Sequence, residues 1–266
     1  MHSHVVPSSR VSTPGKKVNL GTAPIPSVEA AGRMKAILEK ISASLVSTGI
    51  RLLHNRNTPK FSREEIRYLR LSFSQFGEDI ALGRWFDEFF QIQNGVYVDV
   101  GAFHPIHYSN TLLLHKKGWR GVNIDMNADK VAFFKALRPD DVNVHAAANN
   151  VSGKARALHS GLVEEMVLDP KGDIPVRRLD DILAETPFRK IDYLNIDCEG
   201  HDYDVLQSID LDLYQPKVIT IEALGADAAS RLGDYLASNG YALKEKFHYT
   251  LLFVRGKAPL IDWGGE

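Results

Sequence analysis

Three short runs of β-branched residues alternate with two helical segments between residues 95 and 148. The runs are GVYVDVGA (95–102), GVNIDM (121–126) and VNVHAAA (142–148), and each is typical of a buried strand. The segments between them, 109–118 and 128–138, have the periodicity of helices; the predicted N-caps are Ser109 or Asn110 for the first and Asn127 for the second, and Gly118 is expected to end the first. This βαβαβ order predicts parallel strands joined by right-handed crossovers, so we expect the chain to fold around an α/β sheet.

The same alternation continues in the C-terminal half of the chain. DYLNIDCEG (192–200) and VITIEAL (218–224) are two further predicted strands, and we expect a helix after each of them. Residues 241–255 are expected to form an antiparallel hairpin at the edge of the sheet. Between the two halves, residues 149–187 are less regular, with two short predicted strands and a helix that begins at LDDIL.

The residues before this sheet have a different character. Residues 1–26 are rich in Ser, Pro, Gly and Lys and are expected to be a disordered arm, followed by a helical N-terminal extension at 27–73. An apolar stripe between residues 28 and 53 favours packing on the main domain or on another subunit, so a homo-oligomer through this helix is expected. A surface for a membrane or a partner protein is the alternative. Ser62 and Ser74 are the predicted caps of the next two helices.

The bulk composition argues against several classes of function. The chain has 266 residues and a formal net charge of -1, which gives no global field to attract a nucleic acid. Cys198 is the only cysteine, so no intramolecular disulfide can form and a reducing compartment is expected. No apolar run is long enough to span a bilayer, and the N-terminus lacks the apolar core of a secretory signal. The sequence therefore predicts a cytoplasmic protein with no transmembrane segment and no nucleic-acid partner.

The ends of the first two predicted strands carry residues that point to a bound nucleoside. The first strand ends in Asp99, Val100 and Gly101, and the second ends in Asp125. At the carboxyl ends of parallel strands, a glycine lets the backbone approach a ligand and a carboxylate can accept hydrogen bonds from two ribose hydroxyls. The loop GAFHP holds one glycine instead of the three of a dinucleotide fingerprint, which leaves room for an adenosine without phosphates. The structural alternative is that Asp125 starts the next helix and Gly101 turns the chain.

Several of these segments occur together and in a familiar order. GVYVDVGAFHPIHYSNT, GWRGVNID, LDDIL and IDYLNIDCEGHDYDVL resemble the FkbM family of S-adenosylmethionine-dependent methyltransferases. The upstream SQFGEDI is similar to the lead-in of one branch of that family. The resemblance covers roughly residues 74–255, so residues 74–266 are expected to be the methyltransferase domain.

The resemblance implies a Rossmann-like class I methyltransferase fold, with a mostly parallel seven-stranded sheet, an antiparallel edge strand and a reversed last strand. It implies O-methylation, often of a sugar hydroxyl on a glycan, a polyketide or another natural product. It also implies a site: Asp99 and Gly101 beside the methionine part of the cofactor, and Asp125 on the ribose. The remaining residues that it places at the cofactor are Ala146, Ala147 and Asn149 near the adenine, and Gln75 and Glu78 above it.

Transfer of a methyl group to a hydroxyl requires alignment of the reactants and a base for the hydroxyl proton. Asn195, Asp197 and Glu199 alternate along the predicted strand 192–200, and His201 follows them, so their side chains are expected on one side of the sheet edge. The base is expected to be His201, because its pKa is near neutral, or a carboxylate whose pKa burial raises. His104, before Pro105, is a further candidate, with a solvent-facing loop residue as the alternative.

Other chemistries stay open for the same residues. Asp197 and Glu199 are also candidate ligands for Mg²⁺ or Mn²⁺, which would lower the pKa of a bound diol. A nicotinamide-dependent oxidoreductase is a second hypothesis, and the missing glycines count against it. A non-catalytic binding module on the same fold is a third, and the carboxylates near Asp197 count against it because buried charges are costly without a role.

Overall fold

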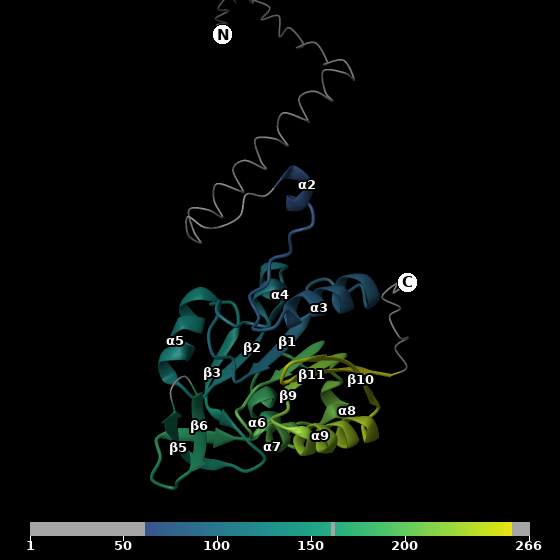
Figure 1. Cartoon of the computed structure of the whole chain (residues 1–266). Coiled ribbons are helices and arrows are strands. Elements are labelled where there is room, and N and C mark those ends of the chain that lie inside the picture. Colours follow the sequence, from purple (N-terminus) through teal and green to yellow (C-terminus); the bar gives the residue numbers. More distant parts are fainter. Residues whose placement is uncertain (1–61, 161–162, 257–266) are drawn as a thin grey trace, which may run out of the picture. The chain divides into compact units, whose positions relative to one another are not determined.

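The computed structural model describes residues 62–160 and 163–256 (Figure 1). The chain divides into two compact units, Met1–Leu69 and Arg70–Glu266. The predicted arm and the apolar stripe between residues 28 and 53 lie outside the described residues, as does the oligomer surface expected there.

In the first unit, the described residues contain the short helix α2 (Arg63–Ile66). The Ser62 hydroxyl accepts a hydrogen bond from the Glu65 backbone N–H, and the Glu65 carboxylate accepts one from the Ser62 backbone N–H. This capping box satisfies two N–H groups that a helix start leaves unpaired. The cap predicted at Ser62 is confirmed.

A seven-stranded sheet with the order β10-β11-β9-β8-β1-β2-β3 forms the centre of the second unit. Its strands are β1 (Val96–Val100), β2 (Arg120–Asp125), β3 (Val142–His145), β8 (Tyr193–Ile196), β9 (Val218–Glu222), β10 (Tyr241–Phe247) and β11 (Thr250–Arg255). Neighbours from β3 to β9 pair in parallel, whereas β11 is antiparallel to both β9 and β10. The mostly parallel seven-stranded sheet is therefore confirmed, and its reversed last strand lies one position in from the edge strand β10.

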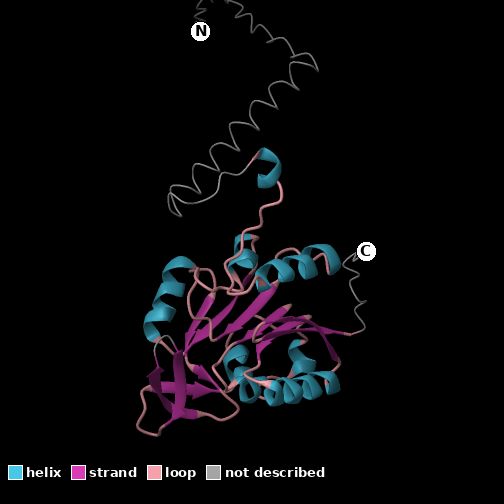
Figure 2. Cartoon of the chain, viewed as in Figure 1, coloured by secondary structure: helices cyan, strands magenta, loops and turns pink. Residues whose placement is uncertain are grey.

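Helices cover both faces of this sheet (Figure 2). On one face an aromatic core that includes Trp85, Tyr97 and Tyr193 packs beneath the first set of helices. These are α3 (Glu78–Arg84), the π-helical turn η1 (Trp85–Phe89) and α4 (Leu112–Lys116). On the other face an aliphatic core that includes Val98 and Leu194 packs on α6 (Leu179–Ala184), α7 (Asp202–Leu206), α8 (Leu211–Tyr214) and α9 (Ala226–Ser238). Successive strand residues thus face opposite cores, and helix α5 (Ala128–Leu137) packs on β2 and β3.

A second, four-stranded sheet with the order β4-β7-β5-β6 corrects the prediction for residues 142–187. Its strands are β4 (Ala147–Ala148), β5 (Gly153–Ser160), β6 (Val163–Leu168) and β7 (Ile174–Arg177). The predicted third strand of the main sheet breaks after His145, and Ala147 and Ala148 pair with β7 instead. Residues 149–187 hold three strands where two were expected, because β5 pairs along both of its edges. Such pairing between distant segments leaves little local signal in the sequence.

The start of α3 differs from the predicted cap at Ser74. The N-cap is Gly77, with a φ of 87°, and Glu78 and Asp79 occupy the first turn as expected. The Ser74 hydroxyl still accepts hydrogen bonds from the backbone N–H groups of Gly77 and Asp79. Ser74 therefore stabilises the turn that leads into α3, but it is not the N-cap of that helix.

The two helices between the first three strands follow the prediction in part. Asn127 caps α5 by accepting hydrogen bonds from two backbone N–H groups, and Gly118 ends α4 with a φ of 95°, so both predictions are confirmed. Helix α4 begins after Thr111, and neither Ser109 nor Asn110 caps it. The Ser109 hydroxyl instead accepts a hydrogen bond from a buried guanidinium.

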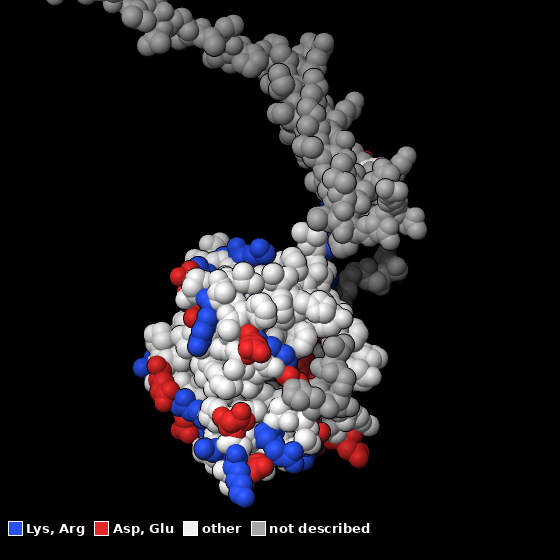
Figure 3. Space-filling view, turned by 90° about the vertical axis from the view of Figure 1, so that its left-hand side faces the viewer, with Lys and Arg blue, Asp and Glu red and all other residues white. Residues whose placement is uncertain are grey.

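Charges of both signs are mixed on the face of the molecule seen in Figure 3, and most of that face carries neither. No helix within the described residues is long and apolar enough to cross a membrane.

Candidate active site

A cavity of about 320 Å³ opens at the carboxyl ends of β1, β2 and β8. Its wall includes most of the residues predicted from the sequence: Gln75, Glu78, Asp99, Gly101, Asp125, Ala146, Ala147, Asn195, Asp197, Glu199 and His201. His104 and Asn149 are not part of that wall. The parallel register explains the gathering, since Asp99 pairs with Asn123 on one side and with Asn195 on the other.

Gly101 brings the ends of β1 and β8 into close contact. Its φ of 74° lies in the left-handed region, where glycine carries no steric penalty. A Cβ at this position would overlap the carbonyl oxygen of Asp197 and lie 2.8 Å from its carbonyl carbon. The first strand can therefore end this close to Asp197 only with glycine at position 101.

Asp99 is buried at the end of β1 and is held from two sides. Its Oδ2 accepts a hydrogen bond of 2.8 Å from the Thr111 hydroxyl, and its Oδ1 accepts one of 2.9 Å from the Asn195 side chain. Burial raises the pKa of Asp99, while these two hydrogen bonds and the charge of Arg138 oppose that rise. The carboxylate is thus fixed in place with its remaining lone pairs available to the cavity.

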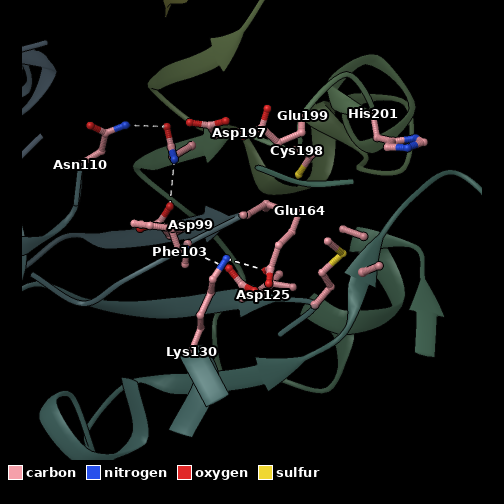
Figure 4. A pocket seen from close by; sticks show the side chains of 18 of the residues that line it. Asp99, Phe103, Asn110, Asp125, Lys130, Glu164, Asp197, Cys198, Glu199 and His201 are labelled. Carbon is pink, nitrogen blue, oxygen red and sulfur yellow. Dashed lines mark hydrogen bonds and ion pairs between the residues drawn. The ribbon is translucent and has the colours of Figure 1, made fainter. Parts of the chain in front are cut away.

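Asp125 lies at the end of β2 and lines the cavity (Figure 4). Its Oδ2 accepts a hydrogen bond of 2.9 Å from the backbone N–H of Phe103, and its Oδ1 accepts one of 2.8 Å from that of Asn127. Burial raises the pKa of Asp125, and the charge of Lys130 is the main opposing effect. A carboxylate offers about four acceptor positions, so two remain for a pair of hydroxyl donors.

The second sheet supplies one wall of the cavity, which the sequence did not reveal. Lys130 of α5 forms an ion pair of 2.7 Å with Glu164 of β6, and its ammonium lies 4.6 Å from the centre of the Phe103 ring (Figure 4). The Asn127 side chain donates a further hydrogen bond of 2.9 Å to Glu164. Met166 of the same strand also lines the cavity. These contacts join the β5–β6 hairpin to the edge of the main sheet at which β1 and β2 end.

Asp197 is the carboxylate best suited to take up a proton. Burial, together with the neighbouring charges of Asp202 and Glu199, raises the pKa of Asp197 to about 7. No described residue donates a hydrogen bond to its carboxylate, which lines the cavity. Asp202, by contrast, accepts bonds from the backbone N–H groups of Cys198 and Gly200, so it serves the turn that leads into α7.

Glu199 and Glu222 complete the acidic surroundings of Asp197. Glu199 adopts a left-handed backbone with a φ of 50°, and burial raises the pKa of its carboxyl while Lys130 opposes that rise. Glu222 ends β9, and burial together with Asp197 raises its pKa to about 9. Glu222 is not part of the cavity wall, and a carboxyl with this pKa is mostly protonated and neutral at pH 7.

The two candidate histidines lie in different places. Nε2 of His201 is 2.9 Å from the carbonyl oxygen of Met166, which makes Nε2 the donor and ties α7 to β6. Figure 4 shows its ring to one side of the cavity, beyond Cys198. Nδ1 of His104 accepts hydrogen bonds from the backbone N–H groups of Ile106 and His107, so it organises its own loop.

The other residues predicted at the cofactor lie partly inside and partly outside the cavity wall. Glu78 is buried and accepts a hydrogen bond of 2.9 Å from the Phe76 backbone N–H, and Gln75 lines the cavity beside it. The backbone N–H of Asn149 donates to the carbonyl oxygen of Arg177, so this residue joins β4 to β7 outside the cavity wall. Ala146 and Ala147 are the predicted adenine neighbours that line the cavity.

The metal hypothesis lacks a complete ligand set within the described residues. No three His, Cys, Asp or Glu side chains are grouped there so as to hold a metal ion. Asp197 and Glu199 line the same cavity, but no third residue of these types is grouped with them in the described part of the chain, so a metal at these two residues stays a prediction.

Sequence reasoning missed several residues that line the cavity: Phe103, Tyr108, Asn110, Met126, Lys130, Glu164, Met166 and Thr250. Asn110 was considered only as a helix cap, although Asn in the loop after the first strand is a residue type that binds ligands. Phe103 and Tyr108 have positive φ values of 55°, and strained aromatic residues of this kind gather at binding sites. Thr250 comes from the hairpin at 241–255, which was predicted, but no local signal in the sequence indicated that this residue lines the cavity.

The family comparison bears on the region that contains Asp197. A model described as the methyltransferase FkbM domain matches residues 171–243. This segment of the chain is therefore similar to the FkbM methyltransferase domain. The matched segment includes LDDIL and IDYLNIDCEGHDYDVL, whereas the motifs at β1 and β2 precede it. The mostly parallel seven-stranded sheet with its reversed strand is the class I fold that the resemblance predicted.

Three of the solved structures that are similar to this chain are methyltransferases. FkbM methyltransferase from Methylobacillus flagellatus KT is 15% identical with a TM-score of 0.43, and the match covers 61% of this chain and 44% of that one. Precorrin-6y C5,15-methyltransferase from Geobacter metallireducens GS-15 is 12% identical (TM-score 0.41, 70% and 92% covered). The Burkholderia thailandensis 1,6-didemethyltoxoflavin-N1-methyltransferase, solved with S-adenosylhomocysteine, is 10% identical (TM-score 0.38, 91% and 99% covered). The chain thus spans less than half of the first of these proteins, and no curated sequence matches it.

Proposed function

We propose that the protein transfers the methyl group of S-adenosylmethionine to a hydroxyl of a sugar or a sugar-bearing metabolite. One observation carries the proposal: a single cavity is lined by Asp125, with acceptor positions for two hydroxyls, and by Asp197, whose carboxylate receives no hydrogen bond from the described residues. The first suits a ribose, and the second suits an acceptor that must lose a proton.

The cavity wall fits the cofactor along its length. The buried Oδ1 of Asn110 has no hydrogen-bond partner and, with the Asp99 carboxylate, suits the ammonium group of the methionine part. Asp125 would accept hydrogen bonds from the ribose hydroxyls. Ile124, Ala147 and Met166 give an apolar wall beyond it, which suits the adenine ring.

When bound, S-adenosylmethionine supplies an electrophilic methyl group on a sulfur that is a good leaving group. Asp197 would accept the hydroxyl proton as the new carbon–oxygen bond forms, so that the acceptor oxygen does not retain a positive charge. Asp99 and Asp125 would fix the two ends of the cofactor and hold the methyl group in line with the acceptor. No covalent bond to the protein is needed.

The acceptor side of the cavity favours a ring with both apolar and hydroxyl faces. Tyr108 lines the cavity with about half of its surface exposed, and its ring stacks 3.7 Å from that of His107. Aromatic rings of this kind pack on flat apolar surfaces, such as one face of a sugar. Gln75, Asn110 and Thr250 line the same cavity and can bind hydroxyls.

The substitution Asp125→Ala tests the ribose contact. Removing two hydrogen bonds to a charged acceptor is expected to weaken S-adenosylhomocysteine binding about 100-fold, measured by calorimetry. Because Phe103 and Asn127 also lose a partner, the melting temperature should fall as well. Asn127→Ala is the control: it removes the cap of α5 and costs about 1 kcal/mol of stability, but it should keep the affinity within a few-fold. Equal affinity losses in both variants would contradict the ribose assignment.

The rate of transfer is expected to rise with pH between about 6 and 8. Asp197 must be ionised to accept a proton, and its pKa of about 7 means that the ionised fraction grows as pH rises through neutrality. The measurement is the initial rate at saturating cofactor across this range. A rate that is flat from pH 6 to pH 8 would count against Asp197 as the base.

The direct test of the proposed function is mass spectrometry of glycans and small metabolites from cells with and without the protein. The proposal predicts a product that is one methyl group heavier, with the methyl on a sugar oxygen. A methyl group on nitrogen or carbon would overturn the O-methylation proposal.

Added Mg²⁺ or Mn²⁺, compared with a chelator, tests the metal hypothesis in the same reaction. Binding of NAD or NADP instead of S-adenosylhomocysteine would favour the oxidoreductase hypothesis. Binding of S-adenosylhomocysteine without any methylated product would favour the non-catalytic binding module.

A further inference from the structure

Arg138, directly after α5, is a buried cation with only 1% of its surface exposed. Its guanidinium donates hydrogen bonds to the Pro105 carbonyl oxygen at 2.6 Å and to the hydroxyls of Ser109 at 2.9 Å and Thr111 at 2.8 Å. A fourth, longer bond of 3.4 Å reaches the Tyr97 hydroxyl. All four acceptors are neutral oxygens, which is unusual for a charge so far from water.

Two buried carboxylates lie one hydroxyl away from this guanidinium. The Thr111 hydroxyl donates to Asp99 at 2.8 Å, and the Tyr97 hydroxyl donates to Asp141. A guanidinium can only donate, so the Thr111 and Tyr97 hydroxyls accept from Arg138 and keep their own protons for Asp99 and Asp141. Arg138 therefore sets the direction of the hydrogen bond that Asp99 receives.

The consequence for Asp99 is a fixed orientation at the cavity. Thr111 satisfies Oδ2 and Asn195 satisfies Oδ1, so the plane of the carboxylate cannot rotate freely. The lone pairs that these two donors leave unused are the ones available to a ligand in the cavity that Asp99 lines. A rotated or differently hydrogen-bonded Asp99 would present fewer of them.

Arg138 also holds the loop between β1 and α4. It binds Pro105 through the carbonyl oxygen and Ser109 through the hydroxyl, two points on either side of Tyr108. Asn110, whose buried Oδ1 has no partner, follows directly and lines the cavity next to Asn195, to which it donates at 3.1 Å. One side chain thus fixes both the loop and the carboxylate at this end of the site.

We propose that Arg138 is a positioning residue for the amino-acid end of the cofactor, acting through the Thr111 hydroxyl on Asp99. The inference rests on the proposed function, because it takes the cavity to be the cofactor site. We call the hydrogen bonds from Arg138 to the Thr111 hydroxyl and from that hydroxyl to Asp99 the relay. The inference predicts that loss of the relay weakens binding of the methionine part and leaves binding of the adenosine part unchanged.

The substitution Thr111→Val tests the relay with little change in side-chain size. Calorimetry on the full chain should show about tenfold weaker binding of S-adenosylhomocysteine, the value of one hydrogen bond to a charged group. Binding of 5′-methylthioadenosine, which lacks the amino-acid part, should stay within twofold of the wild type. Thr111→Ser restores the hydroxyl and should restore the affinity. Thr186→Val is the matched control, since Thr186 is also buried with a bonded hydroxyl but caps the end of α6.

Arg138→Lys keeps the charge but cannot bind all four neutral oxygens at once, because an ammonium has three N–H donors and lacks the planar fork of the guanidinium. It should weaken S-adenosylhomocysteine binding about tenfold or more, and adding Thr111→Val to it should cause no further loss. Equal losses for both ligands, no loss for either, or fully additive losses in the double variant would overturn the inference. A wild-type chain that binds neither ligand would instead overturn the proposed function, and this inference with it.

Discussion

The protein with Gly101→Ala is expected to show no measurable binding of S-adenosylhomocysteine. The new Cβ would overlap the carbonyl oxygen of Asp197, which belongs to the backbone and cannot move as a side chain can. To relieve this overlap, the ends of β1 and β8 must separate, and their separation displaces both Asp99 and Asp197. The left-handed φ of 74° adds about 1–2 kcal/mol of strain for any residue with a Cβ. Calorimetric titration together with a melting curve measures both effects.

Gly240→Ala is the matched control for this prediction. Gly240 also has a positive φ, of 81°, but a Cβ there would meet nothing within 4 Å. It should lose about 1–2 kcal/mol of stability from backbone strain alone and bind S-adenosylhomocysteine as the wild type does. If Gly101→Ala behaved like Gly240→Ala, the close contact between the two strand ends would not be essential to the site.

Asp197→Asn is expected to lower kcat by about 10²- to 10⁴-fold on the acceptor that mass spectrometry identifies, which is the usual contribution of a general base. Asparagine keeps the shape of the side chain but cannot take up the hydroxyl proton. Because the carboxylate receives no hydrogen bond from the described residues, its replacement should change the affinity for S-adenosylhomocysteine by only a few-fold. The rise in rate between pH 6 and pH 8 should also disappear.

His201→Gln and Glu199→Gln serve as comparisons for Asp197→Asn. His201 is bonded to Met166, so its loss should loosen the contact between α7 and β6 and affect KM more than kcat. Glu199 neighbours Asp197, and its neutralisation should lower the pKa of Asp197 and shift the rise in rate toward lower pH. A larger loss of kcat in His201→Gln than in Asp197→Asn, with the pH dependence removed, would identify the histidine as the base.

The part of the site at the ends of β1 and β2 could be predicted from the sequence because the patterns that indicate these strands are local. Asp99, Gly101 and Asp125 each end a strand whose β-branched run is visible in a few residues. Parallel pairing then brings strand ends to one edge without further information. The acidic residues after β8 followed from the same logic, and the reversed hairpin at 241–255 was equally visible in its alternating pattern.

The rest depends on contacts between distant segments. Lys130 and Glu164 meet only because β5 and β6 fold back over α5, and nothing near either residue indicates this. The second sheet was missed for the same reason, since β4 is two residues long and its partner β7 lies far along the chain. The burial of Arg138 could not be predicted from the sequence, because an arginine that follows a helix is expected on the surface.

The most direct measurement of the central claim is a crystal structure of the protein with S-adenosylhomocysteine bound. The account predicts that both ribose hydroxyls lie within hydrogen-bond distance of Asp125. It also predicts the amino group near Asp99 and Asn110, and the sulfur facing the side of the cavity that Asp197 lines. A ligand bound outside this cavity, or an Asp125 carboxylate that makes no contact with the ribose, would contradict it.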